Sequence, residues 1–216
     1  MYLVGLSVGP PLQMAELAAI LATVLAAVAA LPQLRRVAAG DGLGVSLSGA
    51  ALGVVNESVW VAYATSERLW SAVPEAGLMA TTNLLLVVWL LRAGATGRRR
   101  AAAAAVLWAG TLAVVEAVGG AAGLALVLGA AYGVQVAPAV WTAWRTVSPS
   151  GLATSTWAFV LVESALWGCY GVHHGDPATT TLGVVGVVAG SAIVGRKVMV
   201  RRRDASTALV VTPALP

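Results

Sequence analysis

Long apolar runs constrain this chain more than any other feature of its sequence. Seven stretches hold few charges and approach the roughly 20 residues that a helix needs to cross a bilayer. Their side chains do not alternate between apolar and polar, as the strands of a membrane β-barrel require. The sequence therefore predicts seven transmembrane helices, at residues 14–34, 45–65, 76–91, 101–118, 124–144, 152–172 and 178–195.

The composition agrees with a location in a membrane. Hydrophobic residues make up 59% of the 216 residues and charged residues only 10%, whereas charged residues are about a quarter of an ordinary soluble domain. A soluble chain of this size cannot bury so much hydrocarbon. We expect an all-α, multi-pass integral membrane protein of the cell membrane, embedded in the lipid bilayer. Nucleic-acid binding is not expected, because the basic residues form short clusters between apolar runs.

The basic residues predict an orientation for the seven helices. Seven spans place alternate loops on opposite sides, and 12 of the 13 basic residues then fall on one side, with Arg68 alone on the other. The positive-inside rule makes the basic side cytoplasmic. The N-terminus is therefore expected outside and the C-terminus in the cytoplasm. The residues from Asp204 onward are predicted to be disordered.

An internal repeat divides the chain into two similar parts. The matched positions, 106 or 107 residues apart, are Pro32 and Pro138, Glu57-Ser58 and Glu163-Ser164, and Trp60 and Trp167, each tryptophan followed three residues later by tyrosine. Because a three-helix unit that starts outside ends inside, a second copy in the same orientation needs one extra crossing. The repeat predicts a 3+1+3 plan, two parallel three-helix repeats joined by an inversion helix.

The repeat also predicts the divisions of the chain. We expect an outer N-terminal segment at 1–13, a first three-helix repeat at 14–93, a basic loop and inversion helix at 94–120, a second repeat at 121–197 and a basic cytoplasmic tail at 198–216. The glycine-rich stretch 119–123 predicts a tight turn between the fourth and fifth helices. Glycines four residues apart predict close approaches between helices, at Gly49/Gly53, Gly129/Gly133 and Gly186/Gly190.

A series of short motifs lies at the matched positions. The first repeat holds Pro32-Gln33, a basic patch, a Gly-Leu-x-x-Ser turn from Gly42 to Ser46, and Trp60-x-x-Tyr63, and the second holds Pro138, Gly168-x-Tyr170-Gly171 and Asp176-Pro177. This series resembles the PQ-loop superfamily, and within it the SWEET (MtN3/saliva) sugar transporters. The resemblance implies a carrier that works by alternating access at a cavity between the repeats.

The resemblance also implies where solute contacts and hinges lie. SWEETs resemble one another in having an asparagine near the start of the third helix of each repeat, and Glu75 and Gly183 stand at these positions here. Of the four prolines of the SWEET gating tetrad, Pro32 and Pro138 are present and are expected to act as hinges, although static kinks remain an alternative. The solute stays open between a sugar and an amino-acid-like compound.

Two carboxyl groups are the most informative polar residues. Glu57 and Glu163 lie in the middle of predicted spans at equivalent positions of the repeats. A carboxyl group there costs a few kcal/mol unless it faces a cavity or a partner. The pair is interpreted as a proton-titrating pair or as a ligand for a cationic or zwitterionic solute. Alternatively, each is a protonated carboxyl group that hydrogen-bonds a neighbouring helix.

Aromatic and amide side chains complete the predicted cavity. Trp60 and Trp167 are expected to stack on the solute from opposite sides, with membrane-interface anchors as the alternative. Glu75 and Asn83 are added as cavity candidates. The other tryptophans lie nearer the ends of the spans and are expected in the interfacial belt: Trp70, Trp89, Trp108, Trp141, Trp144 and Trp157.

These observations predict a membrane transporter that moves a small polar solute, with proton linkage left open. The alternative is a non-transporting receptor or scaffold of the same architecture that binds a ligand or peptide. Enzymatic activity and a cofactor are not expected, because the sequence holds no nucleotide-binding or hydrolase motif. A metal site is not expected either, since the adjacent His173 and His174 lack the spacing of helical metal ligands. Assembly as a homo-oligomer stays open.

Overall fold

The computed structural model describes residues 10–40, 45–145 and 154–211. Within these ranges the chain is helical and contains no strand, which confirms the predicted all-α fold. The helices are α1 (Pro10–Ala38), α2 (Leu47–Ser66), α3 (Val73–Arg92), α4 (Arg98–Arg145), α5 (Thr154–His174) and α6 (Pro177–Val211).

Local chemistry explains where several helices begin. Ser46 is the N-cap of α2, and its hydroxyl oxygen accepts a hydrogen bond from the Gly49 amide at 3.1 Å. Helix α3 has proline in its first turn, where the missing amide hydrogen is not needed. Asp176 precedes α6 and accepts a hydrogen bond from the Thr179 amide at 2.7 Å. These caps fix the ends of the helices that surround the centre of the molecule.

Helix α4 is divided by a single glycine. Gly120 has φ 59° and ψ −160° within a helical run of 48 residues, and such a backbone conformation favours glycine because it has no Cβ. The chain reverses there, so α4 consists of two arms, residues 98–119 and 121–145. The predicted turn over 119–123 is thus made by one non-helical residue.

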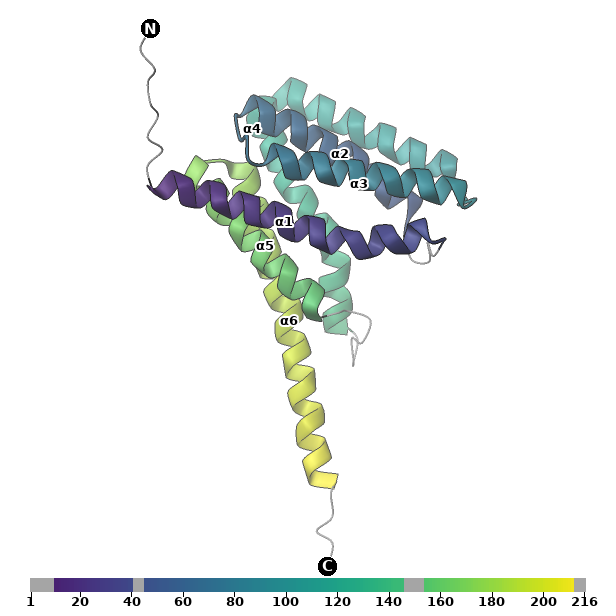
Figure 1. Ribbon diagram of the computed structural model, residues 1–216, viewed down its shortest axis with the longest axis vertical. Helices are drawn as coiled ribbons and strands as arrows, with labels where there is room; N and C mark the ends of the chain where they lie inside the picture. Colours follow the sequence, from purple (N-terminus) through teal and green to yellow (C-terminus); the bar gives the residue numbers. More distant parts are fainter. Residues whose placement is uncertain (1–9, 41–44, 146–153, 212–216) are drawn as a thin grey trace, which may run out of the picture.

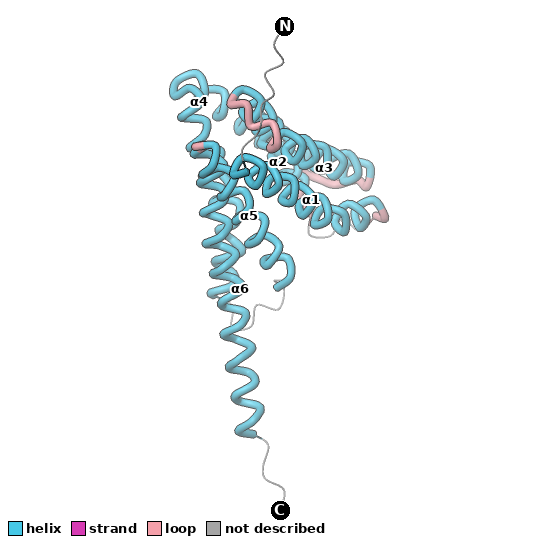
Figure 2. Tube along the Cα trace, turned by 60° about the vertical axis from the view of Figure 1, so that its left-hand side comes forward, coloured by secondary structure: helices cyan, strands magenta, loops and turns pink. Residues whose placement is uncertain are grey.

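The C-terminal segment differs from the sequence prediction of disorder. Helix α6 continues to Val211, and in both views it extends beyond the other helices (Figures 1 and 2). The residues from Arg196 to Val211 include neither proline nor glycine, and several of them are good helix formers, so nothing stops the helix until the chain approaches Pro213. The prediction was wrong up to Val211, and residues 212–216 lie outside the described ranges.

Several helices are compatible with a membrane protein. Within the described residues, four helices are long and apolar enough to cross a bilayer: Gln13–Pro32, Val73–Arg92, Arg98–Arg145 and Pro177–Arg203. Helices α2 and α5 are not among these four. Each of them carries a glutamate followed by a serine at its centre, at Glu57 and Glu163, which makes it more polar.

Helix α1 shows how side chains are distributed between the inside and the outside. Its buried residues are mainly small, among them Ala15, Ala19, Ala22 and Ala26, whereas its exposed large residues include Leu17, Ile20, Leu21 and Val24. A soluble helix buries its large apolar side chains and exposes polar ones. Small residues inside and aliphatic residues outside are typical of helices that pack in lipid.

The helices form two limbs with the same internal packing. The first limb comprises α1, α2, α3 and residues 98–119, and the second comprises residues 121–145, α5 and α6. Helix α3 packs against both α1 and α2, and α6 packs against both α4 and α5. The third helix of each predicted repeat therefore contacts the other two in both halves, as expected for an internal repeat.

The two limbs meet at one end and diverge towards the other (Figures 1 and 2). The joined end contains the α2–α3 turn, Gly120 and the α5–α6 turn. The diverging end contains the end of α1, the connection between α3 and α4, the end of α4 and the beginning of α5. Most of the basic residues lie at or beyond this diverging end, whereas Arg68 lies at the joined end.

Glycines allow helices to touch within each limb. A Cβ atom at Gly53 would lie 2.6 Å from Cγ of Asn83 on α3, and one at Gly190 would lie 3.0 Å from Cβ of Leu161 on α5. At Gly129 the neighbour is Thr181 of α6, at 2.8 Å from the added Cβ atom. The predicted close approaches are confirmed at these glycines, whereas Gly49 faces only its own cap.

Gly129→Ala is expected to destabilise the protein by about 1–3 kcal/mol, because the added methyl group overpacks the contact between α4 and α6. Its Cβ atom would meet both the Thr181 side chain and the Ala178 carbonyl oxygen, at 2.8 and 3.2 Å. The check is the thermal unfolding midpoint of the purified protein in detergent. Gly110→Ala is the matched control, since nothing lies within 4 Å of a Cβ atom there. Equal midpoints for the two variants would contradict the close approach.

Candidate functional site

A cavity of about 730 Å³ lies between the limbs. Residues of α1, α2, α3, both arms of α4 and α5 form its wall, which consists mainly of alanine, glycine, valine and leucine. It reaches Ala29 and Ala30 in the second half of α1, and Val45 and Ser46 before α2. These segments lead towards the diverging end, so the cavity lies on that side of the centre.

Five carboxyl and amide side chains interrupt the apolar wall. Glu57 of α2 and Glu163 of α5, the matched glutamates of the two repeats, both line the cavity. The amide side chains are Asn56, Asn83 and Gln135. No lysine, arginine or histidine occurs among the described lining residues. The wall therefore offers acidic and amide groups to a bound molecule, without a cation.

The amide groups are only partly satisfied within the protein. Nδ2 of Asn56 donates a long hydrogen bond of 3.4 Å to Oε1 of Glu57, whereas Oδ1 of Asn56 is buried without a partner among the described residues. Nδ2 of Asn83 donates to the Met79 carbonyl oxygen of its own helix at 2.9 Å. Buried polar atoms usually have partners, so Asn56 keeps hydrogen-bonding capacity for a molecule in the cavity.

Glu75 is a third carboxyl group close to the pair. It lies in the first turn of α3 and is not one of the lining residues. Its side chain hydrogen-bonds with that of Trp167, and it is close enough to Glu163 and Glu57 for their charges to interact. Its Oε2 atom is buried without a partner in the described part of the chain. Carboxyl groups from three helices, α2, α3 and α5, thus converge between the limbs.

The predicted stacking pair, Trp60 and Trp167, is placed in the core. The two tryptophans are only 7% and 5% exposed and are absent from the described cavity wall. Each packs edge-on against the tyrosine one turn later, with ring centroids 5.7 Å apart for Trp60 and Tyr63 and 5.5 Å apart for Trp167 and Tyr170, both at 88°. The two repeats therefore share the side-chain geometry of this tryptophan–tyrosine pair as well as its sequence.

The structure also places residues in the cavity wall that were not among the predicted site residues. Trp108, expected in the interfacial belt, lines the cavity together with Thr82 and Gln135. A glutamine inside an apolar span was an available signal in the sequence. Trp108 had no such signal, because the wall it joins is made by helices distant in sequence.

The two prolines predicted to act as hinges both lie inside helices. Pro32 lies within α1, six residues before its end. Pro138 lies in the second arm of α4, where the structure describes its backbone but not its side chain. The Gly-Leu pair at residues 42–43, which begins the predicted Gly-Leu-x-x-Ser turn, also falls outside the described ranges.

A buried hydrogen-bond cluster lies at the joined end. The Tyr63 hydroxyl group donates to Oδ1 of Asp176. The other carboxylate oxygen, Oδ2, accepts from the amide and from the hydroxyl group of Thr179, at 2.7 and 2.5 Å. Tyr63 belongs to the first limb and Asp176 to the second, so this cluster connects the limbs.

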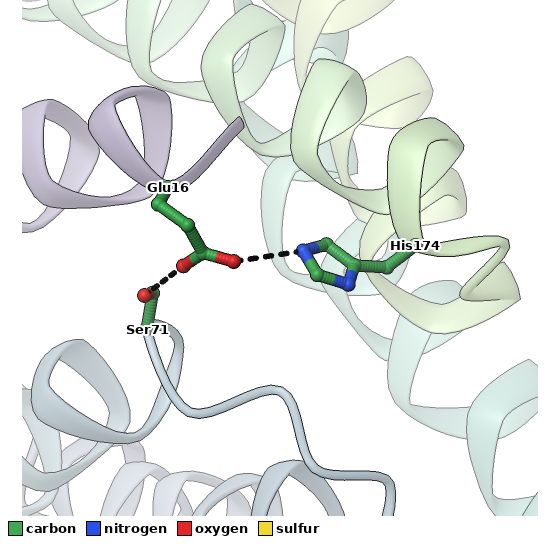
Figure 3. A network of polar contacts seen from close by, with 3 residues as sticks. All are labelled: Glu16, Ser71 and His174. Atoms are coloured by element: carbon green, nitrogen blue, oxygen red, sulfur yellow. Dashed lines mark hydrogen bonds and ion pairs between the residues drawn. The ribbon is translucent and has the colours of Figure 1, made fainter. Parts of the chain in front are cut away.

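Glu16 makes a second polar connection at the same end (Figure 3). One carboxylate oxygen, Oε2, accepts a hydrogen bond from the Ser71 hydroxyl group in the α2–α3 turn. The other, Oε1, lies 3.1 Å from Nε2 of His174 at the end of α5. Together with the tyrosine–aspartate cluster, these contacts hold the limbs together on the side opposite the cavity.

Comparisons with protein-family models, with curated proteins and with solved structures find no match to this chain. The resemblance to the PQ-loop superfamily stays a prediction from the sequence motifs.

Tyr63→Phe is expected to destabilise the joined end by about 1.5–3 kcal/mol, because it removes a hydrogen bond to a buried charged group. Asp176→Asn is expected to destabilise the protein more than Tyr63→Phe does, because Asp176 also caps α6 through Thr179. The measurement is a double-mutant cycle of Tyr63→Phe and Asp176→Asn on the thermal midpoint. Strictly additive effects would show that the two side chains do not interact.

Proposed function

We propose that this chain is a membrane carrier that moves a small polar solute by alternating access. The observation that carries the proposal is the cavity between two similar limbs, into which the matched Glu57 and Glu163 bring carboxyl groups. A central site between repeats that approach and separate is the usual arrangement of carriers built from internal repeats. The polar contacts at the joined end then close the outer side, and the cavity is reached from the diverging side.

The proposal includes a topology of seven spans. Counting the two arms of α4 separately gives a 3+1+3 order, with residues 98–119 as the inversion helix. The basic residues gather at the diverging end, which makes this end cytoplasmic by the positive-inside rule. The motif resemblance to the PQ-loop superfamily and to SWEETs supports the same arrangement.

The chemistry of the wall limits the proposed solute. Carboxyl and amide side chains with no basic residue among the described lining residues favour a neutral, zwitterionic or cationic solute over an anion. Hydrogen-bonding groups on an otherwise apolar wall suit a sugar or an amino-acid-like compound. A proton is a second species that the converging carboxyl groups can hold.

Glu57→Gln and Glu163→Gln are expected to reduce solute flux at least tenfold or to remove its dependence on a pH gradient, because each removes a charge from the site. The measurement is uptake of a panel of sugars and amino acids into proteoliposomes, with and without a pH gradient. Glu116→Gln is the matched control, since this glutamate is exposed and is not among the lining residues. Wild-type uptake in both cavity variants would refute the assignment of the pair.

The same proteoliposomes test the receptor alternative. Saturable flux with only this protein present supports the carrier. Tight solute binding without flux in the wild-type protein would overturn it in favour of a receptor.

The topology predicts opposite labelling at the two ends of the molecule. In a Cys169→Ser background, which removes the exposed native thiol, Glu67→Cys at the joined end should react with an impermeant maleimide added outside intact cells. Arg99→Cys at the diverging end should react only after the cells are opened, since it lies on the basic side. The reverse pattern would overturn the orientation, and labelling of both from outside would overturn the span count.

A further inference from the structure

The contact between Glu16 and His174 joins the limbs through a carboxyl group and an imidazole ring. Glu16 lies near the start of α1 and His174 at the end of α5, and the Glu16 Oε1 to His174 Nε2 distance is 3.1 Å. The second carboxylate oxygen is held by Ser71. Figure 3 shows the carboxylate between the two partners. The bridge therefore spans α1, the α2–α3 turn and α5.

The neighbourhood of His174 leaves Glu16 as its charged partner. The Tyr170 ring lies 4.3 Å from the His174 ring and covers it, and the His173 ring lies 5.3 Å away. Asp176 is already engaged by Tyr63 and by two groups of Thr179. The other titratable groups around the small cavity that His174 lines are Tyr63, Glu67 and Asp176, and α4 contributes only Ala121, Ala122 and Ala125 to it.

The contact is partly shielded from solvent. The side chains of His174 and Glu16 are 21% and 32% exposed. An exposed ion pair contributes little because water screens it, and the pair gains strength as it is desolvated. Solvent still reaches both groups, so protons can exchange between the imidazole and the water on that side.

We propose that Glu16 and His174 form a proton-sensitive latch that holds the limbs together at the joined end. The carboxylate accepts a charge-assisted hydrogen bond even from a neutral imidazole, and protonation of the imidazole adds the attraction between two opposite charges. Proton binding to the imidazole therefore favours the joined arrangement, and loss of the proton favours separation. In this scheme the hydrogen bond between Tyr63 and Asp176 also crosses between the limbs, and the latch adds the pH dependence.

The direction of the pH effect follows from the two side-chain types. A protonated imidazole is positive and an ionised carboxylate is negative, so the latch is strongest while both groups carry their charges. Raising the pH on this side until the imidazole loses its proton releases the latch, and in the carrier proposed above this would speed opening to the outside.

The latch rests on the proposed alternation of the limbs, but its test needs no solute. Spin labels on Met14→Cys of α1 and Val172→Cys of α5, both exposed positions near the joined end, report the separation of the limbs in a Cys169→Ser background. We expect the separated fraction, measured by pulsed electron–electron distance distributions in nanodiscs, to rise about two- to fivefold between pH 5.5 and 7.5.

Two variants and one control give the test its specificity. His174→Gln and Glu16→Gln keep a hydrogen-bonding side chain but cannot form the ion pair, so both should lose the pH response. His173→Gln, which changes the exposed neighbouring histidine, should keep it. A pH response that survives His174→Gln, or limbs that never separate at any pH, would overturn the latch. A normal pH response in a protein without solute flux would support the latch and overturn the carrier instead.

Discussion

The surface of this protein offers hydrocarbon to its surroundings, and that constraint orders the rest of the structure. Side chains such as Leu17 and Ile20 point outward, and alanines such as Ala19 and Ala22 fill the space between helices. Polar groups then have to find partners inside. They are found at two places between the limbs, the cavity with Glu57 and Glu163 and the joined end with Glu16 and Asp176.

The repeat explains why the polar groups are paired. Glu57 and Glu163 occupy equivalent positions on the second helix of each repeat, and the tryptophan–tyrosine pair one turn later has the same edge-on geometry in both. Joining two similar units face to face brings equivalent positions together at the interface. A third carboxyl group, that of Glu75 in the first turn of α3, lies beside this pair.

Much of the helical framework could be predicted from apolar runs, because lipid requires every buried backbone group to be satisfied within a helix. The limits of the prediction have local reasons. The predicted turn holds three glycines, Gly119, Gly120 and Gly123, and the sequence alone does not single out Gly120 as the residue that leaves the helix. The cavity role of Trp108 and the partnership of Glu16 with His174 depend on contacts between distant segments. Continuous helical propensity carries α6 beyond residue 195, where the last span was predicted to end, into the terminal segment that was predicted to be disordered.

The charges at the two ends of the molecule favour the arrangement that the structure shows. Arginines lie at the diverging ends of both limbs, for example Arg98 on the first and Arg145 on the second. Bringing these ends together places like charges closer to one another, which is unfavourable at low ionic strength and becomes easier as salt or anionic lipid headgroups screen them. At the joined end, by contrast, hydrogen bonds and an ion pair of opposite charges cross between the limbs. In the proposed carrier, the balance between repulsion at one end and attraction at the other would decide which side of the cavity is open.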